Sequence, residues 1–165
     1  MIAIRPLELA NIQSFVDIHL KCFEETYYGI FPQEVIDVRW NKRNDRVLHV
    51  QKRMLEESNY FYYCLYDDFH IVGIMIFSIL DGVGILDALY LMKDYQGYGY
   101  GTKMLQQMES VLEERGVLEY SIYVFPILKA NNFFLKNGSL FVQEDMISIH
   151  GKDYKEIEYV KKIGG

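Results

Sequence analysis

Three glycines at alternate positions stand between an apolar run and a strongly periodic segment, and this arrangement restricts the fold more than any other feature. The apolar run ends at Leu91, and residues 96–102 then read Gln-Gly-Tyr-Gly-Tyr-Gly-Thr. Glycines leave backbone N–H groups unobstructed, and the first turn of a helix has N–H groups without intrahelical partners. The segment therefore predicts a strand, a glycine-rich turn and a helix whose N-terminus receives phosphate oxygens.

Two familiar phosphate-binding loops do not fit this segment. The dinucleotide-binding pattern Gly-x-Gly-x-x-Gly fails at Thr102, and no strand–helix–strand unit surrounds it. The Walker A order is also absent, because Lys103 follows a threonine instead of preceding one. The remaining interpretations are a phosphate loop of another class and a glycine-rich turn that binds no ligand.

Apolar periodicity and turn residues predict the other elements. Strands are expected at residues 1–4, 60–66, 71–80, 83–91, 118–125, 140–149 and 154–163. Helices are expected after Asn11, across residues 32–57 with a break around 41–44, from 102 to 116, and over 127–137. The order β-α-α-β-β-β-α-β-α-β-β predicts an α/β or α+β fold with a mixed sheet.

The helical spacing also identifies candidate core residues. The first helix has Ile12, Phe15, Val16, His19, Leu20 and Phe23 at that spacing. Across residues 32–57 the shared face contains Val47, Leu48, Gln51, Met54 and Leu55. The helix after the glycine turn has Met104, Leu105, Met108, Val111 and Leu112 on one side.

Composition narrows the range of partners. The chain has 165 residues, which predicts one domain over residues 1–165. With 50% hydrophobic and 24% charged residues, it has the composition of an ordinary globular protein. Its net charge of −6 argues against a nucleic-acid partner, because that affinity comes from clustered Lys and Arg. We therefore expect a cationic or neutral substrate.

Cysteine usage and hydropathy indicate the compartment. Cys22 and Cys64 have no metal-ligand spacing, so neither a zinc site nor a disulfide framework is predicted. No basic segment followed by a long apolar run opens the chain, and residues 71–80 are too few to span a membrane. We expect a soluble, cytoplasmic protein with no metal and no membrane partner.

The motif Gln96-x-x-Gly99-x-Gly101 matches the [Arg/Gln]-x-x-Gly-x-[Gly/Ala] signature of the GCN5-related N-acetyltransferase (GNAT) family. Residues 88–91, the helix after the motif and residues 130–138 also resemble the family's usual sequence. The chain therefore resembles a GNAT protein over nearly its whole length. The resemblance implies a mixed, mostly antiparallel sheet of about seven strands flanked by about four helices.

The resemblance also implies acetyl-CoA as the cosubstrate. Its pyrophosphate would bind the N–H groups of the glycine turn, its pantetheine arm would pair with residues 89–91 like an added strand, and its acetyl group would lie where the fourth and fifth strands separate. The implied cofactor-binding residues are Leu89, Tyr90, Leu91, Gln96, Gly97, Tyr98, Gly99, Tyr100, Gly101, Thr102, Asn132 and Phe134. Lys93, Lys129 and Lys136 could offset the anionic charge of the cofactor or be ordinary surface lysines.

Acetyl transfer needs a neutral amine, and deprotonating an amine with a pKa of about 10.4 at pH 7 costs roughly 4–5 kcal/mol. The candidate bases are Asp87, which precedes the implied pantetheine-pairing run, and Glu24 and Glu25 at the end of the first helix. In the family this helix end lines the acceptor site. The alternatives are a solvated Asp87 and an ordinary acidic helix end.

The chain departs from the family at Phe134. Family members commonly have a tyrosine there, which protonates the departing CoA thiolate, and phenylalanine cannot donate a proton. The family's upstream asparagine is replaced by Ile127. A thiol with a pKa of about 8.5 is a tolerable leaving group, so turnover need not be lost. Tyr90, Tyr98 or Tyr123 could take over the role of the acid.

Together these features predict an acetyl-CoA-dependent N-acetyltransferase that transfers acetyl directly, in a ternary complex, to a primary amine of a small molecule or peptide. The alternative is a catalytically weak or inactive acyl-CoA sensor, because of Phe134 and Ile127. A third interpretation is an interaction protein that forms a homodimer through the exposed edge of the closing hairpin. The sequence does not identify the acceptor amine, whose site is built from variable segments.

Overall fold

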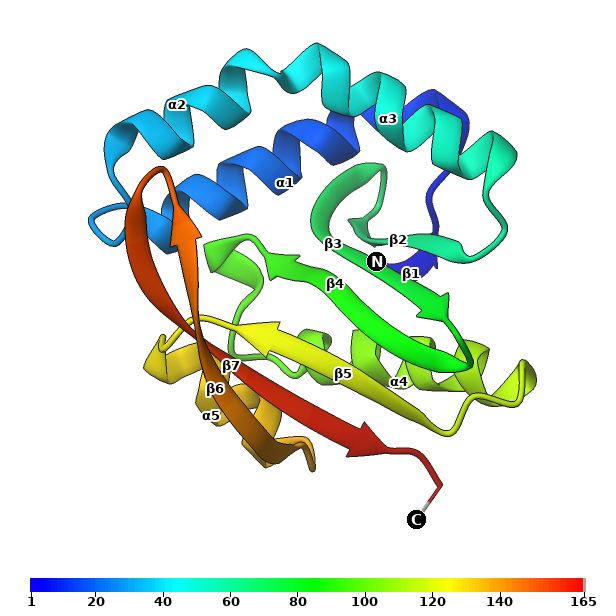
Figure 1. Ribbon diagram of the computed structural model, residues 1–165. Coiled ribbons are helices and arrows are strands. Elements are labelled where there is room, and N and C mark those ends of the chain that lie inside the picture. The colour runs from blue at the N-terminus through cyan, green and yellow to red at the C-terminus, as the bar shows by residue number, and fades with distance from the viewer. Residues whose placement is uncertain (165) are drawn as a thin grey trace.

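A computed structural model describes residues 1–164, and its strands form one seven-stranded sheet with helices on both faces (Figure 1). The strands are β1 Ile2–Pro6, β2 Tyr60–Asp67, β3 His70–Leu80, β4 Val83–Leu91, β5 Glu119–Val124, β6 Leu140–Ile149 and β7 Lys152–Lys162. The α-helices are α1 Ile12–Tyr27, α2 Gln33–Asn41, α3 Arg43–Glu56, α4 Tyr100–Glu114 and α5 Leu128–Lys136. Short 3₁₀ turns lie at Leu9–Asn11 and Lys93–Tyr95.

The strand order across the sheet is β1-β2-β3-β4-β5-β7-β6, and the β4–β5 pair is the parallel one. The predicted mixed, mostly antiparallel sheet and the element order are therefore confirmed. The helix count differs from about four because residues 32–57 form two helices. The backbone leaves helical geometry at Lys42, with φ −96° and ψ 18°, inside the range where a break is expected.

Two apolar cores lie on opposite faces of the sheet. Helices α1 and α3 pack on one face against β2 and β3, and α4 packs with α5 on the other. The predicted apolar stripes of α1 and α4 are buried, because residues at i, i+3 and i+4 share one side of a helix. The side chains at most 1% exposed are Phe15, Val16 and Leu20 in α1 and Met104, Leu105, Met108 and Leu112 in α4.

The predicted buried face of α3 is wrong in part. Val50 is 2% exposed, and Val47 and Met54 pack against the same core. Leu48 and Leu55 are 62% and 63% exposed. A stripe at i, i+3 and i+7 is enough to bury one narrow helix face, and the two leucines lie outside it.

Strands β4 and β5 pair over a short stretch and then separate. Their parallel register ends at Leu86. On the other edge of β4, Leu86 and Ala88 pair with consecutive residues of β3, so Asp87 is an extra residue that forms a β-bulge. Residues 88–91 remain bonded to β3, but their edge toward β5 is free.

The bulge also decides which side chains of β4 face which core. Leu86 lies in the core beneath α4, as do Leu89 and Leu91. Ala88 and Tyr90 pack instead against the core beneath α1 and α3. Beyond the bulge, β4 therefore presents Tyr90 to the α1 side and its leucines to the α4 side.

An aromatic cluster joins three segments beyond the point of separation. The ring of Phe31, in the α1–α2 loop, lies 4.8 Å from Tyr27, 5.1 Å from Phe125 and 4.9 Å from Tyr154, measured between centroids. Tyr154 belongs to the β6–β7 hairpin, whose tip lies next to α2 (Figure 1). The hairpin, the end of β5 and the α1–α2 loop therefore meet on one side of the gap.

Candidate active site

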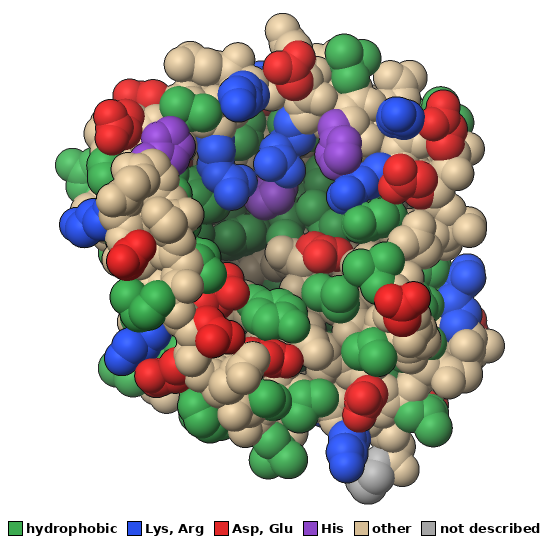
Figure 2. Space-filling model, viewed as in Figure 1, with side chains coloured by type: hydrophobic (Ala, Val, Ile, Leu, Met, Phe, Trp, Pro, Cys, Tyr) green, Lys and Arg blue, Asp and Glu red, His purple; other side chains and the backbone are tan. Residues whose placement is uncertain are grey.

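The separation of β4 and β5 opens a cleft of about 830 Å³ between the two core layers. Its walls come from β4, β5, the end of α1, the N-terminus of α4 and helix α5. Figure 2 shows the molecule hollowed beneath helices α1–α3. The predicted site residues that line the cleft are Glu25, Asp87, Leu89, Tyr90, Leu91, Gln96, Gly97, Gly99, Tyr100, Gly101, Thr102 and Phe134.

Three predicted residues do not lie on the cleft wall. Tyr98 is 70% exposed, and its ring lies 6.1 Å from that of Tyr100. Asn132 is an exposed residue of α5. Glu24 accepts a hydrogen bond of 2.8 Å from Nε1 of Trp40, which connects α1 to α2. The structure gives Glu24 a role in helix packing, whereas the neighbouring Glu25 faces the cleft.

The glycine turn has the geometry of an anion-binding loop. Gly97 and Gly99 have φ +84° and +85°, and a Cβ on either residue would meet no atom within 4 Å. Gly99 is the N-cap of α4, and no side chain caps this helix end. The N–H groups of the first helical turn therefore lack intrahelical partners and lie at the positive end of the helix dipole.

Gly101 is small for a different reason than the sequence analysis predicts. A Cβ there would lie 3.0 Å from ring carbons of Phe133, closer than carbon atoms normally pack. The missing side chain lets α5 approach the N-terminal turn of α4. Gly101 therefore serves helix packing, while Gly97 and Gly99 serve the backbone conformation of the loop.

Gln96 holds the start of the loop in place. Its Nε2 donates a hydrogen bond of 2.9 Å to the carbonyl oxygen of Leu91, and its Oε1 accepts one from Nζ of Lys129. Lys129 lines the cleft together with Lys93 and Lys136. These three lysines place positive charge on the side of the cleft where the unpartnered N–H groups lie.

Asp87 lies in the bulge of β4, within electrostatic reach of Arg53 on α3. Burial raises the pKa of Asp87, while a hydrogen bond from Ser78 and the charge of Arg53 act in the opposite direction. Ser78 is 1% exposed, so the bond to Asp87 satisfies a buried hydroxyl. A carboxylate with a raised pKa is a stronger base than a solvated one.

Tyr90 lies next to α1, with its ring 5.4 Å from the imidazole of His19. Burial raises the pKa of Tyr90 well above its ordinary value, and the Tyr27 hydroxyl adds to the shift. Burial and Glu158 likewise raise the pKa of Tyr123, which also lines the cleft. Both phenols therefore keep their protons at neutral pH. Phe134 is 6% exposed and belongs to the core beneath α4.

A basic row above the cleft is not among the predicted site residues. Arg39 of α2 and Arg46 and Arg53 of α3 are spaced by seven residues, about two helical turns. Figure 2 shows Lys, Arg and His side chains gathered along the rim of the hollow under α1–α3. Arg46 and Arg53 share one face of α3, but Arg39 belongs to α2, beyond the break at Lys42, so the spacing alone could not predict the row.

Neither cysteine is suited to a reactive role in the site. Burial raises the pKa of Cys22 to about 11 and that of Cys64 to about 12, so both thiols are protonated and behave as apolar side chains. Within residues 1–164, no three His, Cys, Asp or Glu side chains are grouped to hold a metal ion. In the same part of the chain, no helix is both long and apolar enough to cross a membrane.

Comparison with known proteins agrees with the geometry. A family model described as "Acetyltransferase (GNAT) family" matches residues 12–138. A spermidine N(1)-acetyltransferase from Thermoplasma acidophilum is 24% identical over 140 residues, which are 83% of this chain and 87% of that protein.

Two solved structures have the same fold. One is the PaiA N-acetyltransferase from Thermoplasma acidophilum in complex with coenzyme A, with a TM-score of 0.78 and 22% identity over 98% of this chain and 99% of that one. The other is a GCN5-related N-acetyltransferase from Rhodopseudomonas palustris, with a TM-score of 0.77 and 21% identity over 98% and 95% of the two chains. Fold and family match together define an N-acetyltransferase. Within that class, the chain belongs to the GNAT family, as its sequence motif predicts.

Proposed function

We propose that this enzyme is acetyl-CoA-dependent and transfers the acetyl group directly, in a ternary complex, to a primary amine of a small molecule or peptide. The observation that carries the proposal is the meeting of two unpaired backbone surfaces in one cleft: the free edge of β4 and the open N-terminus of α4. A thioester held between them would be exposed to an amine entering from the α1 side.

The described residues fit coenzyme A. Unpartnered N–H groups at the start of α4 and the three cleft lysines match a pyrophosphate. The free edge of residues 88–91 offers N–H and C=O groups to an extended amide chain such as pantetheine, which would bind as an added strand. A neighbouring structure of the same fold contains coenzyme A, and this supports the assignment.

Asp87 is the proposed base, acting directly or through a water molecule, because it lies on the cleft wall and has a raised pKa. Glu25 is the alternative base, because it also faces the cleft. Tyr90 and Tyr123 are protonated hydroxyl groups in the same cleft and could protonate the leaving thiolate. Asp87 and Tyr90 both face the α1 side, so we place the acceptor there.

Relatives with stated activities acetylate spermidine or the alanine of ribosomal protein S18, so both small amines and peptide amines occur among similar proteins.

Homodimer formation remains a separate proposal. Edge strand β6 exposes Leu140, Phe141 and Met146 at 64%, 58% and 62%. Light scattering of the purified protein, with and without charged substitutions in β6, would show whether that edge pairs.

The test of the function combines coenzyme binding with thiol release. We expect coenzyme A to bind in calorimetry and acetyl-CoA to release free thiol when members of an amine panel are present. Binding without release for every amine would favour the sensor, which the phenylalanine at position 134 suggests. Absence of coenzyme binding would contradict both interpretations.

A further inference from the structure

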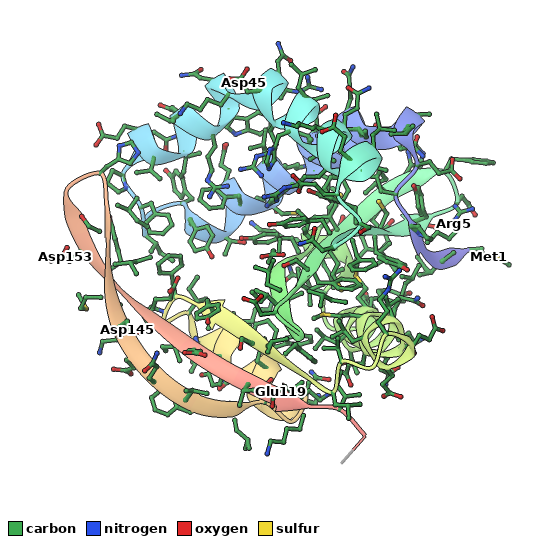
Figure 3. The ribbon with its side chains drawn as sticks, turned by 45° about the vertical axis from the view of Figure 1, so that its right-hand side comes forward. Met1, Arg5, Asp45, Glu119, Asp145 and Asp153 are labelled. Atoms are coloured by element: carbon green, nitrogen blue, oxygen red, sulfur yellow. The ribbon has the colours of Figure 1, made fainter. Side chains whose placement is uncertain are left out.

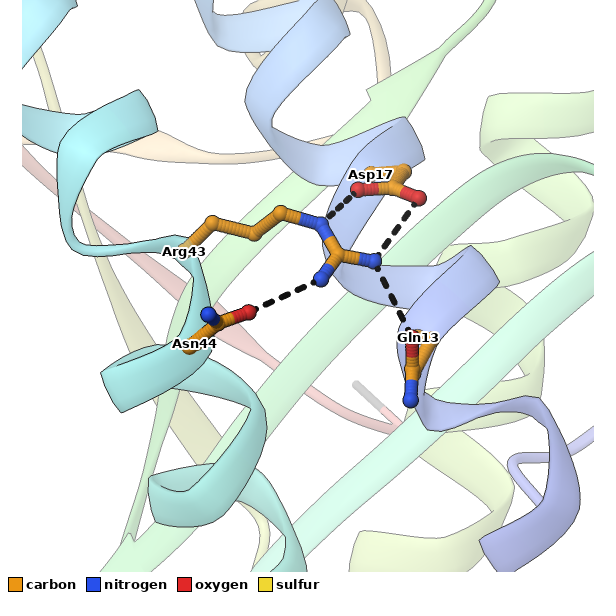
Figure 4. Close-up of polar contacts among 4 residues, drawn as sticks. All are labelled: Gln13, Asp17, Arg43 and Asn44. Atoms are coloured by element: carbon orange, nitrogen blue, oxygen red, sulfur yellow. Dashed lines mark hydrogen bonds and ion pairs between the residues drawn. The ribbon is translucent and has the colours of Figure 1, made fainter.

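Two arginines in the helices above the cleft have no acidic partner within ion-pair distance in residues 1–164. They are Arg39, near the end of α2, and Arg46, in α3. Neighbouring arginines are paired. Arg43 makes two contacts of 2.5 and 3.1 Å with the carboxylate of Asp17 (Figure 4), and Arg53 lies 3.4 Å from Glu57. Arg5 and Arg115 also lack an acidic partner, but they lie against Tyr66 and Phe61, outside the cleft, so Arg39 and Arg46 are the unpaired arginines above it.

The side chains of Arg39 and Arg46 are partly buried, and their charges act on the same neighbouring residue, His19. The guanidinium of Arg39 lies 3.8 Å over the ring of Phe23. Burial and the charge of Arg46 lower the pKa of Arg39. Burial, Arg46 and Arg39 together lower the pKa of His19 to about 3, so His19 stays neutral and adds no counter-charge. Two like charges held near each other without a counterion are unfavourable, and a bound anion would relieve the repulsion.

The arginines lie outside the lining of the cleft, next to the side on which we place the acceptor. The charge of Arg39 acts on Tyr27 and Tyr90, which line the cleft, and Arg53 in the same row acts on Asp87. The cleft lysines lie in other segments, around the N-terminus of α4 and in α5. The coenzyme phosphates therefore have their own positive charges, and the arginine row is left for the other substrate.

Given the proposed function, on which this inference rests, we propose that the acceptor amine also carries a carboxylate or phosphate group, which Arg39 and Arg46 bind. Arginine is suited to this because its planar guanidinium donates two parallel hydrogen bonds to such groups. With its anionic group under α2 and α3, the acceptor directs its amine toward Asp87 on β4. The cleft then accommodates both ends of a zwitterion.

The β6–β7 hairpin, opposite the arginines, would favour a different class of acceptor, a polycation. Glu156 of β7 has a pKa raised by burial, Asp145 and Glu158, so acidic side chains gather on the hairpin. Figure 3 shows Asp145 and Asp153 on this hairpin, away from the sheet edge that carries Arg5. A polyamine would bind these carboxylates and would be repelled by Arg39 and Arg46. The two acceptor classes therefore depend on different residues.

The experiment compares matched amines that differ in one anionic group. The pairs are β-alanine with β-alaninamide and O-phosphoethanolamine with ethanolamine, with spermidine as the polycation. We expect kcat/KM for one anionic member to exceed that of its neutral partner about tenfold or more, the scale of a charge-assisted hydrogen bond. The preferred pair distinguishes carboxylate from phosphate.

Substitutions test whether Arg39 and Arg46 cause the preference for an anionic acceptor. Arg39→Gln and Arg46→Gln should raise KM for the anionic acceptor about tenfold or more and leave both the neutral acceptor and the Kd of coenzyme A unchanged. Arg39→Lys should recover part of the loss. Arg115→Gln is the matched control, because Arg115 is exposed and lies 4.6 Å over Phe61, outside the cleft.

A binding measurement keeps the test independent of turnover. Titration of β-alanine and O-phosphoethanolamine into the coenzyme-bound protein should shift the guanidinium NMR signals of Arg39 and Arg46 and leave those of Arg115 in place. Preference for spermidine or for the neutral amines, with unchanged KM in the arginine variants, would overturn the inference and leave the proposed function standing. Failure of coenzyme binding would instead remove the proposed function.

Discussion

Gly97 and Gly99 have backbone angles that other residues adopt only with strain, and Gly99 also begins the helix whose N–H groups face the cleft. In contrast, Gly101 has an ordinary backbone and is small because Phe133 packs against it. Substitutions at Gly99 and Gly101 should therefore have different effects. The first should affect the ligand and the second the contact between α4 and α5.

We expect Gly99→Val to weaken coenzyme A binding at least tenfold, because a branched side chain strains φ +85° and would lie where the phosphates bind. Isothermal titration calorimetry measures the affinity. Gly151→Val is the control, since Gly151 has φ +76° and open surroundings at the β6–β7 turn. Both variants should lose similar stability. Equal coenzyme affinity in the two would contradict the phosphate-loop assignment.

Asp87→Asn should lower kcat/KM at neutral pH and recover part of the loss in alkaline buffer, where more of the amine is already neutral. Because the pKa of Asp87 is raised, the wild-type rate should fall with decreasing pH at a higher pH than for an ordinary carboxylate. The exposed Asp45→Asn, on the outer surface of α3, should match the wild type (Figure 3). An unchanged pH profile in Asp87→Asn would favour Glu25 or simple desolvation.

At the scale of elements, the acceptor side depends on contacts between segments that are distant in sequence. Phe31 connects the α1–α2 loop with β5 and with the β6–β7 hairpin through three ring contacts. Trp40 connects α2 to α1 through Glu24. The coenzyme side is built separately, from α4, α5 and the end of β4. A change in the aromatic cluster should therefore affect the two substrates unequally.

Phe31→Ala should destabilise the protein by about 3–5 kcal/mol, because a ring that is 5% exposed leaves a cavity. At temperatures where the variant remains folded, KM for the acceptor should rise more than the Kd of coenzyme A. Urea denaturation and steady-state kinetics measure the two effects. Phe69→Ala should change neither, since Phe69 is 94% exposed. Equal weakening of both substrates would show that the cluster supports the whole cleft.

The strands and most helices could be predicted from the sequence because alternation and helical spacing are local. The Asp87 bulge could not, since it depends on how β3 and β4 pair. The same limit explains the misplaced Leu48 and Leu55, whose exposure follows from how α3 rests on α1. Local motifs identified the glycine loop, whereas the arginine row became visible only when α2 and α3 were positioned over the cleft.

At the scale of the whole molecule, average charge is a poor guide to the site. The net charge of −6 favours a cationic or neutral substrate, yet unpaired arginines lie above the cleft and acidic residues lie on the hairpin. Around the hollow, basic side chains therefore gather on the upper edge and acidic ones on the lower edge (Figure 2). The net charge adds these opposite charges together. It therefore does not indicate which end of an acceptor binds to which side of the cleft.

The stability of the whole protein should depend on pH through His19. Its pKa is lowered to about 3 in the folded state, against about 6.5 when unfolded. Between these values the unfolded chain binds a proton that the folded chain does not, so stability should fall as pH decreases from about 6.5. Urea unfolding at pH 7 and pH 5 should show a smaller loss for His19→Phe than for the wild type. The exposed His70→Gln should behave like the wild type.

Because of the bulge, Asp87 is a residue of β4 that has no partner in β3. Leu86 and Ala88 already pair with consecutive residues of β3, and they face opposite cores. Deletion of Asp87 would therefore leave a continuous strand in which every remaining side chain keeps its present side. Loss of Leu89 with the bulge kept in place would instead turn Tyr90 toward the α4 side. Asp87 is the position at which β4 can be shortened without exchanging its two faces, so a deletion there would separate the requirements of folding from those of the cleft.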